Sequence, residues 1–392
     1  MQSRSVLSAA SALSYHPDPA QAVREIASGL EQLGPGRSAA ALFFATPSHG
    51  PSYAGIERAI RAAIGPAEVV GCSAAGVISA AGERERGSAV AALALRGDFA
   101  VQRFYVPSLR GRAEDVGREI GRVVEAVAGE RKTVLLLADS YNLAPDELLA
   151  GIESVAPGTT VLGAGASEDG TTGVATVVGR GAAASNAVAG LVLADVGVRS
   201  IVAQSAAPVG PWLTVTRAEG NRLLELDGKP ALDVFLAHIP ALLRDDLREA
   251  LRRTRAALAE APVANETETP YVVRRLLGAD GAQDALVVGD EVIPGMRFAL
   301  AVRDPSAARE AFSRAVERFV ASGPAVAGAL FFDSVERGES LYGIADLETA
   351  YLRRSLGEVA LAGFFCGAEL APLAGRNRFH QSSGVLVGFS AD

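Results

Sequence analysis

Apolar stretches of strand length recur along this chain in a fixed order, with helix-length segments between them. The pattern occurs three times: an apolar strand that ends in a small polar residue, a helix-length segment, and a second apolar strand that runs into a glycine-rich or acidic tip. The paired strands are ALFFATPS (41–48) with VVGCSAAGVIS (69–79), TVLLLADSYN (133–142) with TVLGAGASEDG (160–170), and GALFFDSVER (328–337) with LAGFFCGAELAP (361–372). After a variable stretch each pair is followed by another apolar strand, at 89–97, 186–196 and 384–389.

This order of elements is that of a repeated β-α-β-β unit. Strands that are joined by a crossover helix lie parallel, and ligands of such sheets bind outside the carboxyl ends of the strands. We therefore expect an α/β fold of two domains, built from repeated β-α-β-β units whose mixed sheets are flanked by helices. The polar tips of the three copies lie at those carboxyl ends and are the first candidates for a ligand site.

The repeat is interrupted after its second copy. SAAPVGP (205–211) places a Pro-Gly-Pro cluster at the end of the strand IVAQSA (201–206), and such a cluster predicts a break. A boundary there divides the chain into an N-terminal domain, 1–208, and a C-terminal domain, 209–392. Beyond it, we expect strand, turn, strand, turn and helix over 212–239, a helix of alternating charge over 241–260, and a helix opened by Pro305 over 305–321.

Composition and charge exclude several classes of protein. Lys and Arg number 37 against 45 Asp and Glu, a net charge of -8, and no basic run supplies the contacts that nucleic-acid phosphates need. No segment approaches the roughly 20 apolar residues of a membrane span, and the N-terminus lacks the apolar region of a signal peptide. Cys72 and Cys366 form no disulfide framework. We expect a cytoplasmic protein that binds neither nucleic acid nor membrane.

The glycine-rich tips do not form a known cofactor motif. VLGAGASEDG (161–170) begins like the dinucleotide fingerprint, but Glu168 takes the place of the third glycine, where its charge would repel a pyrophosphate. The sequence also lacks the nucleophile elbow of serine hydrolases. Four histidines and two cysteines offer too few clustered ligands for a metal. We therefore expect no cofactor and no metal.

Four strings together resemble the FIST family, bacterial sensory proteins with paired N-terminal and C-terminal FIST domains. VVGCSAAG (69–76) is similar to the family's Gly-Cys-Ser signature, and VTRAEGNRLLELDGKPALDVF (215–235) to its inter-domain segment. GFFCGAELAP (363–372) and NRFHQSS (377–383) resemble its C-terminal patterns. The resemblance covers nearly the whole chain. It implies a small-ligand sensor in signal transduction, with amino acids or similar metabolites as ligands and a separate signalling protein as partner.

Three positions depart from the family pattern. The family's N-terminal tip continues Gly-Glu-Ile, whereas Val77 follows the glycine here, so one acidic group is missing. Ala368 precedes Glu369 where the family has glycine. Ser334 replaces the cysteine of a Cys-x-x-Arg pattern that Arg337 completes, which argues against thiol chemistry at that position.

One set of candidate ligand-binding residues could form a backbone cradle. Glycine and other small residues let main-chain N–H groups approach a carboxylate or a phosphate closely. These candidates are Gly71, Cys72, Ser73, Gly76 and Ser167.

A second set consists of polar residues at the ends of apolar strands, where a charge must be paired or solvated. Asp333 or Glu369 could take the ammonium group of a zwitterion, and Arg337 its carboxylate in bidentate fashion. The set is completed by Asp169 and by two residues that could orient the ligand, Asn377 and His380.

Each candidate has a structural alternative. The GCSAAG tip (71–76) could be a tight strand-to-turn junction, the charged residues could form salt bridges with one another, and the polar pair before the last strand could cap a turn. Two other functions also stay open. One is an enzyme with Cys72 or Glu369 in a chemical role, although free cysteine is usually buried. The other is a protein-binding scaffold that uses the helix at 241–260.

Overall fold

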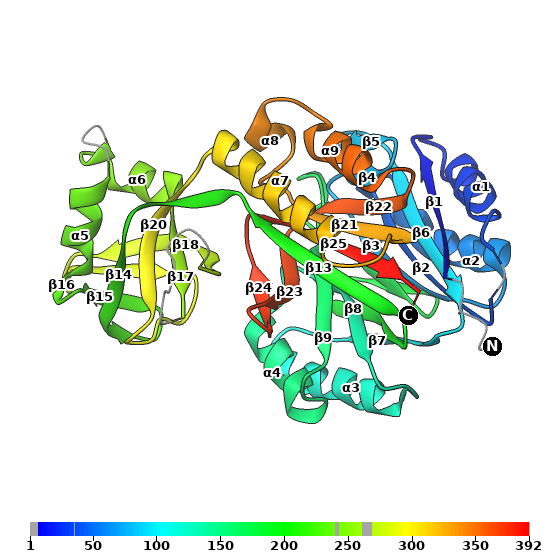
Figure 1. Cartoon of the computed structure of the whole chain (residues 1–392), viewed down its shortest axis with the longest axis horizontal. Helices are drawn as coiled ribbons and strands as arrows, with labels where there is room; N and C mark the ends of the chain where they lie inside the picture. Colours follow the sequence, from blue (N-terminus) through cyan, green and yellow to red (C-terminus); the bar gives the residue numbers. More distant parts are fainter. Residues whose placement is uncertain (1–6, 35, 240–242, 261–268, 392) are drawn as a thin grey trace. The chain divides into compact units, whose positions relative to one another are not determined.

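The chain folds into two compact units. The computed structural model describes residues 7–34, 36–239, 243–260 and 269–391 (Figure 1). The core unit comprises the residues up to Ala203, Phe312–Phe379 and the residues from Ser383 on. The inserted unit comprises Gln204–Ala311 and His380–Ser382, so it is mainly one long insertion in the chain of the core unit.

The core unit repeats one arrangement of elements three times. Each copy has an outer strand, a helix, a first strand, a second helix, a second strand, a two-stranded hairpin and a closing strand. Copy one consists of β1 (Ser8–Ser14), α1 (Pro19–Leu30), β2 (Ser38–Ala45), the 3-10 helix η1 (Pro47–Ser52), α2 (Tyr53–Ile64), β3 (Glu68–Ser73), β4 (Val77–Ser79), β5 (Gly82–Arg84) and β6 (Val90–Gly97).

Copies two and three follow the same order. Copy two consists of β7 (Ala100–Pro107), α3 (Ala113–Ala126), β8 (Lys132–Asp139), α4 (Pro145–Val155), β9 (Thr160–Ala166), β10 (Val177–Gly179), β11 (Ala182–Ala184) and β12 (Ala187–Ala194). Copy three has the inserted unit between its outer strand and its first helix. It consists of β13 (Gly197–Gln204), α7 (Pro305–Ala321), β21 (Gly328–Ser334), α8 (Glu339–Tyr342), α9 (Leu347–Leu356), β22 (Ala360–Cys366), β23 (Ala368–Leu373), β24 (Arg376–His380) and β25 (Ser383–Ser390).

The strands pair in the same way in all three copies. The first strand lies parallel to the second, as β2 to β3, β8 to β9 and β21 to β22. The closing strand runs antiparallel to the first. The predicted crossovers and the predicted fold class, mixed sheets flanked by helices, are therefore confirmed.

Each sheet of the core unit is completed by a hairpin from another copy. The strand orders are β1-β6-β2-β3-β10-β11, β24-β23-β9-β8-β12-β7 and β13-β25-β21-β22-β4-β5. Copy one thus receives the hairpin of copy two, copy two that of copy three, and copy three that of copy one. The exchange is cyclic and interlocks the three copies.

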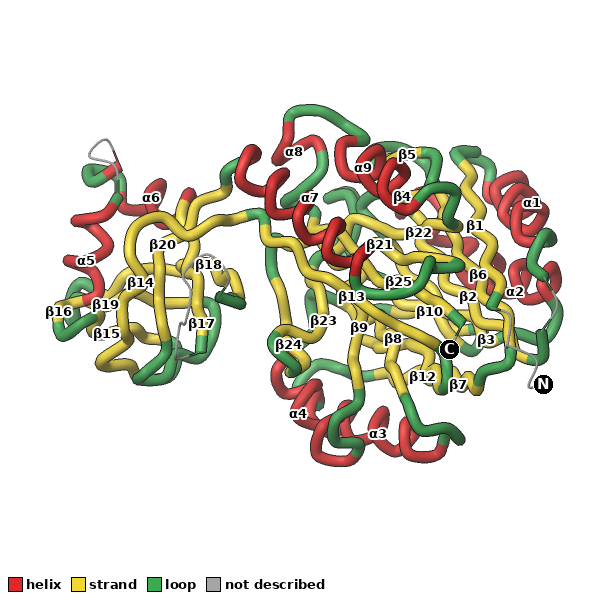
Figure 2. Tube along the Cα trace, viewed as in Figure 1, coloured by secondary structure: helices red, strands yellow, loops and turns green. Residues whose placement is uncertain are grey.

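Apolar side chains of the three sheets share one core. The ring of Phe44 in β2 stacks on that of Phe364 in β22, with centroids 4.6 Å apart, and meets Phe332 of β21 edge-on. Figure 2 shows the helices of the core unit around these strands. Helices α3 and α4 cross closely because Gly117 lacks a side chain: a Cβ there would lie 2.2 Å from the carbonyl oxygen of Leu148. None of the helices in the described ranges is long and apolar enough to span a membrane.

The inserted unit is a closed antiparallel barrel. Strand β14 pairs with β20 on one side and with β15 on the other, and this closes the ring of strands. The elements are β14 (Ala206–Glu219), β15 (Arg222–Leu226), β16 (Lys229–Pro230), α5 (Ala231–His238), α6 (Leu247–Arg253), β17 (Thr254–Ala259), β18 (Val272–Asp280), β19 (Ala285–Val288) and β20 (Arg297–Arg303).

Two expectations for this region need correction. The strand predicted at 201–206 does end, as β13 at Gln204, but the Pro-Gly-Pro cluster does not cause the break: β14 begins at Ala206 and runs through the cluster with a register shift between Val209 and Leu213. An irregularity of this kind tolerates prolines, which cannot donate to a ladder. Of the helix predicted over 241–260, residues 241 and 242 lie outside the described residues, and the described part, 243–260, is not one helix. α6 ends at Arg253, and the chain continues as the buried strand β17 between β18 and β20. Tertiary packing overrides the helix propensity of its alanines, and the scaffold hypothesis loses the continuous charged helix on which it was based.

Candidate functional site

The glycine-rich tips of the three copies meet one another. Ser167, which follows β9, donates its backbone N–H to the carbonyl of Ser73 (3.2 Å), and its hydroxyl accepts the backbone N–H of Ala75 (2.8 Å). The hydroxyl of Ser73 donates in turn to the carbonyl of Ser167 (2.8 Å). The carbonyl of Gly76 accepts the N–H of Phe365, at the tip of copy three (3.0 Å). These polar groups hydrogen-bond from one copy to another, as expected of a strand-to-turn junction.

Packing accounts for Gly71 and Cys72. A Cβ on Gly71 would lie 2.3 Å from the ring of Phe43 on the neighbouring strand. Cys72 is fully buried in the apolar core, and burial raises the pKa of its thiol. A nucleophilic cysteine needs a lowered pKa, so this environment argues against a chemical role for Cys72.

Three further candidates have partners of their own. Asp169 is exposed and accepts the backbone N–H of Thr171 (3.1 Å). Asn377 accepts the N–H of Val161 (2.9 Å) and donates to the carbonyl of Thr159 (2.7 Å), so it fastens β24 to the start of β9. His380 is buried and belongs to the inserted unit.

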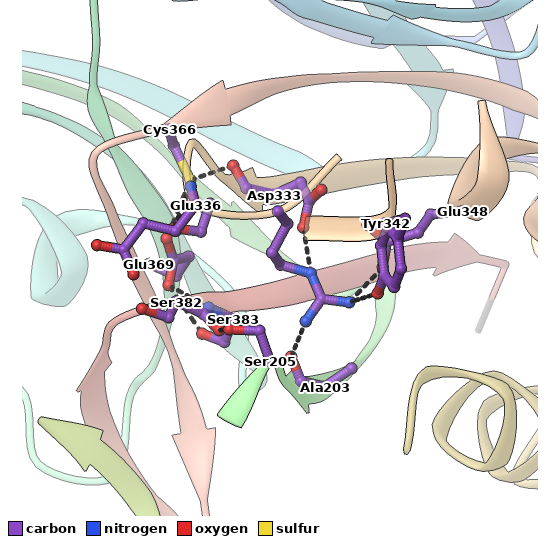
Figure 3. Close-up of polar contacts among 12 residues, drawn as sticks. Ala203, Ser205, Asp333, Glu336, Tyr342, Glu348, Cys366, Glu369, Ser382 and Ser383 are labelled. Carbon is purple, nitrogen blue, oxygen red and sulfur yellow. Dashed lines mark hydrogen bonds and ion pairs between the residues drawn. The ribbon is translucent and has the colours of Figure 1, made fainter. Parts of the chain in front are cut away.

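A buried ionic group lies at the carboxyl end of β21 in copy three (Figure 3). Nε of Arg337 lies 2.8 Å from Oδ1 of Asp333, and its Nη2 donates to Glu348 of α9 and to the hydroxyl of Tyr342 (2.8 Å). Nη1 donates to the carbonyl of Ala203 (3.1 Å). Asp333 is 1% exposed, and Arg337 and Glu348 are fully buried. In this structure Arg337 therefore contacts its acidic neighbours, as in the alternative in which the charged residues form salt bridges with one another.

Glu369 of β23 lies beside this ionic group. Its Oε2 accepts the backbone N–H of Ser383 (3.2 Å) and the hydroxyl of the same residue (2.8 Å). The sulfur of Cys366 lies 3.5 Å from Oε1 of Glu369 and 3.1 Å from the carbonyl oxygen of Asp333, which joins the two parts (Figure 3). We call this set the acid cluster: Asp333, Arg337, Tyr342, Glu348, Cys366, Glu369 and Ser383.

Burial governs the protonation of the acid cluster. Burial raises the pKa of Asp333, and repulsion from Glu348 adds to this effect, whereas Arg337 opposes it. Burial also raises the pKa of Glu369, to about 8, although the hydrogen bonds from Ser383 oppose it. Burial disfavours the charge of Arg337, but Glu348 and Asp333 outweigh it and hold its pKa above the ordinary value. The cluster therefore combines a guanidinium that keeps its charge with a Glu369 that holds its proton more tightly than an ordinary glutamic acid.

The repeat supplies an internal reference for these positions. In each copy a glycine of the second strand pairs with a large apolar residue of the first strand, which aligns the copies residue by residue. The three pairs are Gly71 with Phe43, Gly163 with Leu136, and Gly363 with Phe331.

This alignment shows that the acids are particular to copy three. The residue two positions after the aligned apolar residue is Ala45 in copy one, Ala138 in copy two and Asp333 in copy three. Glu369 pairs with Ala164, the residue after the aligned glycine of copy two. The equivalent hairpin residues, opposite Phe364 and Cys72, are Val77 and Val177.

The structure brings together Asp333, Arg337 and Glu369 of the predicted residues and adds partners that the sequence analysis missed. Glu348 lies four residues before Leu352, on the buried face of α9. A charged residue on the apolar face of a helix is the signal that would have found it. Glu83, on the hairpin from copy one, accepts the N–H of Thr349 (3.0 Å), next to Glu348. This contact depends on the hairpin exchange, for which the sequence holds no local signal.

Comparison with known proteins matches two family regions to the chain, the FIST N domain at residues 39–229 and the FIST C domain at residues 231–372. Similar proteins include the uncharacterized protein Rv0628c of Mycobacterium tuberculosis, which is 29% identical over 96% of this chain and 98% of its own length. The uncharacterized protein Mb0898c of Mycobacterium bovis is 28% identical over 96% of this chain and 97% of its own length. With both regions present in order, the chain belongs to the FIST family.

Proposed function

We propose that this protein is a small-molecule-binding sensory protein of bacterial signal transduction, and that its ligand is an amino acid or a related metabolite with an ammonium group. FIST domains are associated with sensory signal transduction. The observation that carries the proposal is the acid cluster. Copy three buries Asp333 and Glu369 where the other two copies have alanine and valine.

Burying these acids costs stability that the fold could have kept. A carboxyl group that leaves water loses its hydration, and this cost is the reason why burial raises the pKa of both acids. Val77 and Val177 fill the position of Glu369 with an apolar side chain, so the fold itself does not need an acid there. Several perturbed acids at one buried location are typical of functional sites. An ammonium group is the ligand feature that they favour, because it supplies their counter-charge.

Arg337 determines how the ligand's carboxylate could bind. Each of its nitrogens already contacts an oxygen of the protein, so the guanidinium has no idle face for a second carboxylate. If Asp333 moved to the ammonium group of an amino acid, the Nε side of Arg337 would become available to the ligand's carboxylate. The two ends of a zwitterion would then replace the pair that Asp333 and Arg337 form with each other.

Access to the acid cluster requires a segment to move, because side chains fill the cluster. The segment between β21 and α9 carries Arg337, and in it Gly338 and Gly343 have φ angles of 58° and 71°, which glycine adopts without strain. Val335 and Ile344 of the same segment are 44% and 57% exposed. Ligand binding that moves this segment would change a surface that a separate signalling protein can read.

A thermal-shift screen tests the proposal. The panel contains the common amino acids, their primary amines without a carboxylate, and the corresponding carboxylic acids without an ammonium group. A ligand at ~100 times its Kd stabilises the native state by about 2.7 kcal/mol, which is a shift of several degrees. We expect hits among amino acids and amines, and loss of the shift in Glu369→Val and Asp333→Ala, which copy the residues of the other two repeats.

Asp139→Asn is the matched control, because Asp139 is also a buried acid at the end of a first strand, but in copy two. It should keep the ligand shift. An unchanged shift in both copy-three variants would place the ligand elsewhere, and a panel without hits would contradict the proposal.

An enzymatic function that uses Glu369 is the second candidate, because a pKa of about 8 suits a general acid or base. Mass spectrometry of each hit after prolonged incubation separates the two. A sensor returns the ligand unchanged, whereas an enzyme converts it and stops doing so in Glu369→Gln.

A further inference from the structure

The acid cluster contains more carboxyl groups than cations. Its acids are Asp333, Glu348 and Glu369, and its cation is Arg337, which contacts two of the acids at once. One guanidinium balances one carboxylate. Since an unpaired buried charge is expensive, the remaining carboxyl groups need a proton or a second cation.

Glu369 is the acid of the cluster without a direct ionic contact. Its Oε2 accepts two hydrogen bonds from Ser383, whereas its Oε1 has the weak contact with the sulfur of Cys366 at 3.5 Å (Figure 3). A hydroxyl and an amide N–H stabilise the ionised carboxylate, and a thiol is a weak donor and a weak acceptor. Oε1 is therefore the more weakly hydrogen-bonded oxygen of Glu369, and the one at which a proton or a cationic group would act.

The groups around Glu369 and Asp333 come from several elements. β22 contributes Cys366, β25 contributes Ser383, and the turn after β21 contributes Arg337, whose charge acts on Glu369 through space. Glu348 of α9 and Glu83 of β5 repel a charge on Asp333. Tyr342 of α8 adds a neutral hydroxyl that donates towards Glu348. For Glu369, burial favours the neutral form, whereas Ser383, Cys366 and Arg337 favour the ionised form, so one further positive charge beside it would shift the balance towards the carboxylate.

We propose that the ammonium ligand enters the acid cluster in exchange for a proton, so that Glu369 is protonated in the empty protein and ionised in the complex. This inference rests on the proposed function and adds its regulation by pH. In the exchange the O–H bond of Glu369 breaks, the proton leaves to solvent, and the carboxylate pairs with the ligand's ammonium group. A proton leaves and an ammonium group enters, so with an amine ligand the charge of the cluster is the same before and after. An amino acid also brings a carboxylate, which Arg337 would have to accept.

The first test needs no ligand. Infrared difference spectroscopy of the whole protein at neutral pH should show the carbonyl stretch of a buried protonated carboxylic acid, and Glu369→Gln should lose it. Asp333→Asn is the comparison variant: it removes any infrared band of Asp333 and should keep the band of Glu369. If Glu369→Gln showed the same protonated-acid bands as wild type, the inference would be overturned whatever the ligand data show.

The second test is titration calorimetry with the panel's amino acids and with ethylammonium chloride, each run in two buffers of different ionisation heat. We expect close to one proton released per ligand near neutral pH, falling towards none above about pH 8. The apparent Kd should fall about tenfold for each unit by which the pH rises towards that value, and it should level off above it.

The outcomes separate this inference from the proposed function. Binding without proton release and without pH dependence overturns the exchange but leaves the sensor intact. If neither ethylammonium nor any amino acid binds, the proposed function fails and the exchange fails with it.

Discussion

Copy three of the core unit pairs its strands as copies one and two do, although the inserted unit interrupts it, but it differs from them in chemistry. All three have the same order of elements, the same parallel pair and a sheet completed by a borrowed hairpin. At the aligned turn position each copy has a polar residue: His49, Asn142 or Arg337. In copy three that residue contacts two buried acids, Asp333 and Glu348, whereas Asn142 of copy two contacts one, Asp139. The positions aligned with Asp333 and Glu369 are apolar in the other two copies. The repeat thus separates the residues that make the fold from those added to it.

Removing Arg337 should have the largest effect on this difference. Arg337→Ala leaves Asp333 and Glu348 buried without a counter-charge, and breaking a buried ion pair in this way costs about 3–5 kcal/mol. Asn142→Ala at the aligned position of copy two loses one hydrogen bond to Asp139, worth about 1 kcal/mol. Urea unfolding of both variants measures the contrast.

Arg337→Lys keeps a positive charge and covers the case in which Arg337→Ala does not fold. It should recover part of the lost stability, because a lysine cannot reproduce the contacts of all three guanidinium nitrogens. Equal costs for Arg337→Ala and Asn142→Ala would show that copy three carries no special ionic site.

Glu369→Val should stabilise the protein, and by an amount that depends on pH. Because the pKa of Glu369 is raised from 4.5 to about 8 in the folded state, the native protein binds the proton more tightly than the unfolded chain. Wild type therefore loses stability relative to the variant as pH rises from about 4.5 to 8, by about 3–5 kcal/mol in total.

Unfolding free energies of wild type and Glu369→Val at mildly acidic and mildly alkaline pH test this expectation. The reciprocal change, Val177→Glu, puts an acid at the aligned position of copy one's sheet and should destabilise with the same pH dependence. A difference between wild type and Glu369→Val that stays constant with pH would show that Glu369 is solvated.

Asp169→Ala should have the smallest effect. Asp169 is exposed and its contacts are with the neighbouring Thr171, so the change should cost less than about 0.5 kcal/mol. It should also leave any ligand-induced thermal shift as it is in wild type. A lost shift would move the ligand site from copy three to the tip of copy two.

Much of the fold could be predicted because it follows from local patterns of apolar and polar residues. The apolar strands at 41–48 and 69–79 with a helix between them predict a parallel pair, and the structure has it in β2 and β3. Local patterns failed where the barrel of the inserted unit imposes its own geometry. TRAALA (254–259) is compatible with helix and with strand, and only its burial between two other strands decides in favour of β17.

The candidate site could be predicted in part for a related reason. Asp333, Arg337 and Glu369 interrupt apolar strings, which makes them visible in the sequence. Glu348 and Glu83 reach the same region through a helix and a hairpin that lie far from β21 in the chain, so no spacing rule connects them to it.

The cyclic exchange of hairpins has a consequence for how this protein is made. Copy one is the first to leave the ribosome, but its sheet waits for β10 and β11, and the sheet of copy two waits for β23 and β24, which come after the whole barrel has been synthesised. Contacts between such distant segments form slowly, because a long loop must close before they are made. The sheet of copy two must therefore stay unfinished until β23 and β24 emerge, and an N-terminal fragment cut between the two family regions would keep this sheet without the hairpin that completes it.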